Sequence, residues 1–166
     1  MNLSQSSGGS IMSMPKPGEL APDFELLSDE DQPTRLSDFH GRYVVLYFYP
    51  RADTPGCTTE ACGFRDDYSM YEERGVVILG ISPDTVTKQS KFKTKHTLPF
   101  TLLADPENQV SEAYGVWGLK KFMGREHMGV HRTTFLIDPE GKIVQVFEKV
   151  KPATHSAEIL AALEDV

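Results

Sequence analysis

Two cysteines are the residues of this chain whose type and spacing could carry out chemistry. The 166-residue sequence contains Cys57 and Cys62, five positions apart, and no other cysteine. A thiolate is a nucleophile, and a close pair of thiols can form a disulfide or bind a metal. We do not expect a metal, because C-x4-C lacks a second ligand pair at suitable spacing and the histidines are scattered. The pair therefore favours nucleophilic or redox chemistry.

The residues before Cys57 predict that it lies at the start of a helix. Residues 44–49 are a continuous β-branched and aromatic run typical of a buried strand, which Pro50 ends. A Pro-Gly turn then precedes residues 57–73, where aromatic side chains recur at helical spacing. The first turn of a helix presents free backbone N–H groups and the positive end of the helix dipole, and both favour a thiolate.

The segment around the cysteines, PRADTPGCTTEACGFRD, resembles the active-site signature of the peroxiredoxins, in their bacterioferritin-comigratory or Q-type branch. Pro50, Thr54 and Cys57 fit the pattern P-x-x-x-T-x-x-C, and Cys62 stands at the second-cysteine position of that branch. The resemblance covers about residues 17–166 and includes the segments GELAPDFEL, LSDFHGRYVVLYFYP, VWGLKKFMG and HRTTFLIDPEG.

The resemblance implies a thiol peroxidase that reduces hydrogen peroxide and organic hydroperoxides without a metal, haem or flavin. The Cys57 thiolate would attack the peroxide, and the resulting sulfenic acid would condense with Cys62 to a disulfide that thioredoxin or a glutaredoxin-like protein reduces. Arg132 would lie beside the thiolate, and Thr54 would hydrogen-bond to the thiolate or to the peroxide. Pro50 would limit access to the sulfur.

Plainer interpretations of these residues exist. Cys57 and Cys62 could be core residues, Thr54 a loop hydroxyl, and Arg132 a surface residue at the start of a strand. We interpret Glu60, His127 and His131, which are near these elements in sequence, as supporting residues around the site or as surface residues. Two other functions also fit a close cysteine pair: a thiol–disulfide oxidoreductase, which would favour Cys-x-x-Cys, and a non-enzymatic redox-sensing or chaperone-like protein. Peroxide consumption with and without a thioredoxin system distinguishes these three.

The implied disulfide conflicts with the predicted helix. In a regular helix the Cα atoms of Cys57 and Cys62 would lie roughly 8.6 Å apart, on different sides of the axis. A disulfide requires a Cα separation below about 7 Å. At least one helical turn should therefore unwind in each catalytic cycle, and Gly56 and Gly63 on either side should ease that change.

Alternating strands and helices predict the fold class, α/β, and the resemblance specifies a thioredoxin-like fold with a central mixed sheet, flanking helices and an N-terminal hairpin. The expected strands are 24–27, 34–36, 42–49, 76–82, 100–103, 133–138 and 142–149, and the expected helices are 57–73, 85–95, 106–114 and 155–164. We expect the basic residues 88–95 to be a solvated helix face. Residues 116–130 should form a long loop packed by Trp117, Phe122, Met123 and Met128, with a collar at the peroxide entrance or a docking patch as the alternative.

Bulk properties limit the remaining function classes. The formal net charge of −7 argues against binding to nucleic acid or to an anionic membrane surface. There is no secretory signal and no apolar run long enough to span a membrane, so we expect a cytoplasmic protein. The Ser- and Gly-rich residues 1–16 should be a flexible extension to one domain, residues 17–166, which we expect to be a monomer or a weak dimer.

Overall fold

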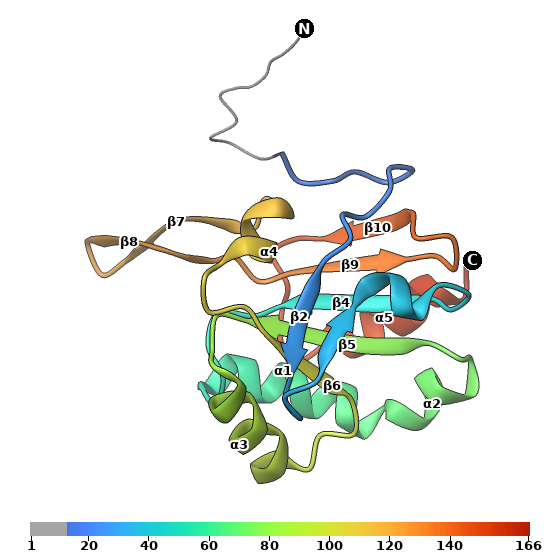
Figure 1. Ribbon diagram of the computed structural model, residues 1–166, viewed down its shortest axis with the longest axis horizontal. Coiled ribbons are helices and arrows are strands. Elements are labelled where there is room, and N and C mark those ends of the chain that lie inside the picture. The colour runs from blue at the N-terminus through green and yellow to red at the C-terminus, as the bar shows by residue number, and fades with distance from the viewer. Residues whose placement is uncertain (1–12) are drawn as a thin grey trace, which may run out of the picture.

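The computed structural model describes residues 13–166, and a seven-stranded mixed sheet forms its centre (Figure 1). The strand order is β10-β9-β4-β5-β6-β2-β3. The strands are β2 (Glu25–Ser28), β3 (Pro33–Arg35), β4 (Val44–Phe48), β5 (Val77–Ser82), β6 (Thr101–Ala104), β9 (Thr133–Ile137) and β10 (Ile143–Phe147). Strands β4, β5 and β6 are parallel, and the others pair antiparallel. The predicted α/β class, the mixed sheet and the N-terminal hairpin are confirmed.

Helices cover both faces of this sheet. On one face pack α1 (Pro55–Asp66), α2 (Tyr68–Glu73), α3 (Val86–His96) and α5 (His155–Leu163). On the other lie α4 (Gln109–Ala113) and the 3-10 helix η1 (Leu36–Phe39). Every side chain of β4 is therefore buried, with Val45 and Tyr47 in one core and Val44, Leu46 and Phe48 in the other. Burial on both faces explains why β4 reads as a continuous apolar run.

The basic residues of α3 behave as predicted. Lys88, Lys91 and Lys95 are exposed, whereas Gln89 and Phe92 on the opposite side of the helix are buried. Thr85 caps the helix by accepting a hydrogen bond from the Lys88 backbone N–H. The lysine run is thus the solvated face of an amphipathic helix.

Two predicted helices differ from the structure. The segment 57–73 is interrupted at Asp67, which ends α1 and precedes α2, and α1 begins earlier, at Pro55. Proline suits this place because the first residues of a helix have no intrahelical acceptor for their N–H groups. The helix predicted over 106–114 is limited to Gln109–Ala113, because Asn108 adopts a left-handed conformation just before it.

The prediction of a long loop over 116–130 is wrong. These residues form a hairpin of β7 (Trp117–Phe122) and β8 (Arg125–Val130), which projects from the body in Figure 1. Met123 and Gly124 form its two-residue turn, and both have positive φ, as type I′ turns require. Trp117 packs on the core, but the predicted packing fails for Phe122, Met123 and Met128, which are exposed.

The N-terminal extension falls mostly outside the described residues, which begin at Ser13. Within residues 13–16, Met14 packs against the core and Pro15 is buried. The packed part of the chain therefore begins before residue 17.

Candidate active site

Cys57 lies where β4 gives way to α1. Its side chain is 1% exposed and belongs to the core under the helices. Thr54 is the N-cap residue of α1, and its carbonyl accepts the Thr58 backbone N–H at 2.8 Å. Within residues 13–166 the N–H groups of Gly56 and Cys57 form no hydrogen bond, because they belong to the first turn of α1. The sulfur thus lies at a helix N-terminus, as the sequence predicted.

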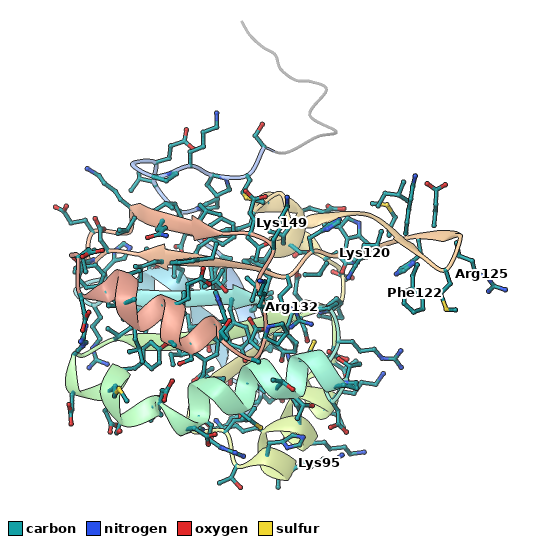
Figure 2. All side chains as sticks on the ribbon, turned by 180° about the vertical axis from the view of Figure 1, so that it is seen from behind. Lys95, Lys120, Phe122, Arg125, Arg132 and Lys149 are labelled. Atoms are coloured by element: carbon teal, nitrogen blue, oxygen red, sulfur yellow. The ribbon has the colours of Figure 1, made fainter. Side chains whose placement is uncertain are left out.

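Arg132 contacts the sulfur from the neighbouring strand. The pairing of Phe48 with Thr133 places the residue before β9 next to the residues that follow β4. Arg132 Nη2 donates to Cys57 Sγ at 3.4 Å, and Nη1 donates to Glu60 Oε1 at 2.7 Å. Figure 2 shows Arg132 between the sheet, α1 and α5. The predicted neighbour of the thiol is therefore in place.

Gly56 allows this approach. A Cβ atom built on Gly56 would lie 3.1 Å from Arg132 Nη2, closer than most real contacts of a Cβ atom. The guanidinium would have to move to accept any larger residue there. The Pro-Gly pair before Cys57 thus both starts the helix and leaves space for the arginine.

Glu60 belongs to the site, whereas the sequence left open whether it supports the site or lies on the surface. Its side chain is completely buried, three residues after Cys57 and on the same helical face. Burial raises the pKa of Glu60 to about 7, against the opposing effect of Arg132. An acidic residue at i+3 from the cysteine, on the apolar side of the helix, is the signal that could have identified it. His127 and His131 are exposed, in agreement with their interpretation as surface residues.

Polar contacts to neighbouring elements and within the loop hold the segment between β4 and α1. The Thr54 hydroxyl donates to the Arg51 carbonyl at 2.8 Å, so its hydrogen is committed within the loop rather than to the thiol. The Asp84 carboxylate accepts the Ala52 N–H at 2.7 Å. Asp53 has a positive φ, and its carboxylate accepts a hydrogen bond from Lys95 at 2.9 Å. Half-buried Pro50 begins this loop.

Cys62 is half-buried and lies in the same continuous helix, α1, as Cys57. Both thiols are free in this structure. Since the helix is unbroken from Pro55 to Asp66, the reduced backbone has the regular geometry that the sequence predicted for residues 57–62.

Residues 13–166 contain neither a metal-ion cluster nor a helix that could span a membrane. This part of the chain has no cluster of three or more histidine, cysteine or acidic side chains able to hold a metal ion. None of its helices combines the length and apolar character needed to cross a membrane.

Comparison with known proteins identifies the family. The model of the AhpC/TSA family matches residues 17–146. The chain belongs to the AhpC/TSA family. Curated relatives include the peroxiredoxin Bcp of Bacillus subtilis, 52% identical over 90% of this chain and 95% of the relative, and that of Escherichia coli K12, 47% identical over 90% and 96%.

Solved structures of similar proteins agree in fold. The peroxidoxin BcpB of Mycobacterium tuberculosis superposes with a TM-score of 0.82 at 38% identity, covering 92% of this chain and 98% of its own. The bacterioferritin comigratory protein of Xanthomonas campestris gives 0.83 at 34% identity, covering 92% and 96%. The thioredoxin-like fold and the peroxiredoxin resemblance are confirmed. Like these relatives, this AhpC/TSA protein is a thiol-dependent peroxidase.

Proposed function

We propose that Cys57 is the peroxidatic residue of this peroxidase and that Cys62 resolves its oxidised form. The observation that carries this proposal is the contact of 3.4 Å between Arg132 Nη2 and Cys57 Sγ. A guanidinium keeps its charge at every physiological pH, so it stabilises a thiolate without titrating. Cys62 shares helix α1 with Cys57 but lacks this electrostatic environment.

In the first step the Cys57 thiolate attacks one peroxide oxygen and the O–O bond breaks. The sulfur is oxidised to sulfenic acid, and the departing alkoxide or hydroxide takes up a proton to become an alcohol or water. Arg132 and the free N–H groups of Gly56 and Cys57 are donors for the charge that develops on the departing oxygen. Thr54 Oγ1, which already donates to Arg51, keeps lone pairs that can accept the peroxide O–H.

In the second step the Cys62 thiol attacks the sulfenic sulfur of Cys57, which forms the disulfide and releases water. A dithiol protein then exchanges with this disulfide and restores both thiols. We assign that role to thioredoxin or a glutaredoxin-like protein, in a reducing cytoplasm that keeps the thiols free. Pro50 at the end of β4 limits access to the sulfur. We propose that the enzyme acts as a monomer, with a weak dimer as the alternative.

Cysteine variants test the two roles. Cys57→Ser should abolish peroxide consumption. Cys62→Ser should still react once with peroxide but lose thioredoxin-linked turnover and over-oxidise more readily, because no disulfide forms for thioredoxin to reduce. Peptide mapping of oxidised wild-type protein should identify a Cys57–Cys62 linkage. If Cys57→Ser still consumed peroxide near the wild-type rate, Cys57 would not be the peroxidatic residue. If the oxidised protein lacked the Cys57–Cys62 linkage, Cys62 would not be the resolving residue.

Arg132→Met tests the electrostatic role. We expect attack on hydrogen peroxide to slow by about 10²-fold, as for loss of one donor aimed at developing charge. Arg125→Met is the matched control, because Arg125 is exposed at the far end of the hairpin (Figure 2). Stopped-flow single-turnover rates for both variants provide the measurement. Equal rates in the two variants would show that Arg132 does not act on the thiol.

A further inference from the structure

The active site holds two acids and one cation. Arg132 Nη2 donates to Cys57 Sγ at 3.4 Å while Nη1 donates to Glu60 Oε1 at 2.7 Å. If thiolate and carboxylate were both ionised, two negative charges would share one positive charge in a buried site. Like charges that share a buried site cannot both ionise easily, so one of the two acids should hold a proton.

The second oxygen of Glu60 indicates where that proton resides. Glu60 Oε2 is buried and has no hydrogen-bond partner within residues 13–166. A buried carboxylate oxygen without a donor is costly, whereas a protonated one is not charged. Burial also raises the pKa of Glu60 to about 7, although Arg132 opposes this. The unpaired buried oxygen and the raised pKa both favour the protonated form of the Glu60 carboxyl.

The other groups that face Glu60 do not neutralise it. Tyr47 on β4 has a buried hydroxyl, and burial keeps its pKa well above the usual value, so it stays neutral. His155 on α5 is also neutral near pH 7, because burial lowers its pKa. Lys120 on β7 donates to the Val130 carbonyl and interacts with the charges of Arg132 and Cys57. Arg132 is thus the cation in contact with Glu60 within residues 13–166.

His155 lies between Glu60 and the exposed Glu158, although it forms no direct hydrogen bond with Glu60. Its Nε2 lies 4.0 Å from Glu60 Oε2 and 2.7 Å from Thr134 Oγ1, and its Nδ1 lies 3.0 Å from Glu158 Oε1. The side chains of Glu60 and His155 are completely buried, whereas that of Glu158 is 56% exposed. An imidazole can accept a proton at one nitrogen and release one from the other.

We propose that Glu60 is a positioning residue that shares one proton with Cys57 through Arg132, and that His155 exchanges this proton with the surface at Glu158. The thiol loses its proton as Glu60 gains one, so the pair Cys57–SH and Glu60–COO⁻ converts to Cys57–S⁻ and Glu60–COOH. The positive charge of Arg132 is then balanced by the Cys57 thiolate alone. This proposal rests on the assignment of Cys57 as the peroxidatic residue.

Reciprocal titrations test the shared proton. Glu60→Gln keeps an oxygen acceptor for Arg132 but removes the negative charge. The midpoint of thiolate absorbance against pH should fall by roughly one to two pH units, the effect of a unit charge several ångströms away at an effective dielectric constant of about 20. In Cys57→Ser the Glu60 carboxyl, followed by carbon NMR, should titrate at a pH lower by the same amount, because linkage is reciprocal. Glu112→Gln, an exposed acid on α4, should leave the thiolate midpoint unchanged.

A pH jump tests the route. Thiolate absorbance should relax several-fold more slowly in His155→Gln than in wild type. Glu158→Gln, a surface change that does not threaten folding, should slow it in the same direction, and Glu112→Gln should not. If the Glu60 carboxyl had the same titration midpoint in wild type and in Cys57→Ser, the two residues would not share a proton. If thiolate absorbance relaxed at the wild-type rate in folded Glu158→Gln, the proton would not leave through His155 and Glu158. The proposed function fails separately, if Cys57→Ser still consumes peroxide.

Discussion

At the scale of single residues, the site depends on how closely one guanidinium approaches the helix start. Arg132 reaches Cys57 and Glu60 at the same time because Gly56 has no side chain. A small displacement of this group would weaken both contacts together. The glycine before the cysteine is therefore part of the geometry of the site as well as of the turn.

Gly56→Ala should slow peroxide attack by about tenfold, since the guanidinium must shift by less than the 1 Å that can cost ~10²-fold. Gly63→Ala is the matched control in the same helix, because its Cβ would meet only Ser156 Cβ, at an ordinary 3.8 Å. Single-turnover rates and thermal unfolding of both variants provide the measurement. Equal attack rates would show that Arg132 adapts to the added methyl group without loss.

The sequence predicted Cys57 and Arg132 as site residues but left the place of Glu60 open. Local patterns identify the cysteine, because a strand, a turn and a helix follow one another around it. The resemblance identifies Arg132, which is 75 residues distant in the chain. The place of Glu60 was left open because an acidic residue on a helix is normally exposed, and its burial depends on the packing of α5 and β9 against α1. No local pattern reports such packing.

At the scale of elements, the proposed cycle requires α1 to be both regular and easily opened. It runs unbroken from Pro55 to Asp66 with both cysteines free, which is the arrangement that keeps them too far apart to bond. Strands and helices were predicted well because their apolar periodicity is local. The β7–β8 hairpin was not, because its glycines and lysines obscured the alternation and Met123 is an unusual residue for its turn.

Hydrogen exchange should detect the opening of α1. In reduced protein the amides from Thr58 to Phe64 should be protected, and in the disulfide form they should exchange rapidly while β4 and β5 remain protected. Reduced and oxidised samples compared by mass spectrometry after a deuterium pulse provide the measurement, and oxidised Cys62→Ser is the control that cannot form the disulfide. Equal protection in the two states would mean that the linkage forms without unwinding.

At the scale of the whole molecule, the buried carboxyl of Glu60 makes stability depend on pH. Its pKa rises from 4.5, the ordinary value, to about 7 in the folded protein. The folded state therefore binds more protons between these values, so this contribution to stability is complete below pH 4.5 and is lost as the pH rises through 7.

Glu60→Gln should consequently flatten the decline in the free energy of unfolding between about pH 4.5 and pH 7. The largest difference expected is about 3 kcal/mol, from a shift of about 2.5 pKa units. Urea unfolding of wild type and variant across this range provides the measurement, with Glu112→Gln as the exposed control. Parallel pH profiles for wild type and Glu60→Gln would indicate that the carboxyl is already ionised in the folded protein.

If Cys62 resolves Cys57 as proposed, the unbroken helix that separates the two sulfurs also limits the peroxide dose that the enzyme tolerates. While α1 stays closed, the sulfenic acid of Cys57 cannot reach Cys62 to form the disulfide. A second peroxide can then convert it to sulfinic acid, which ends the cycle. The peroxide concentration that inactivates half of the enzyme should therefore scale with the rate at which α1 opens. Gly63→Ala, which favours the closed helix by roughly 0.5–1 kcal/mol, should lower that threshold about two- to fivefold. The glycine thus determines how much oxidant the enzyme survives, and counting sulfinic acid by mass spectrometry against peroxide dose would measure it.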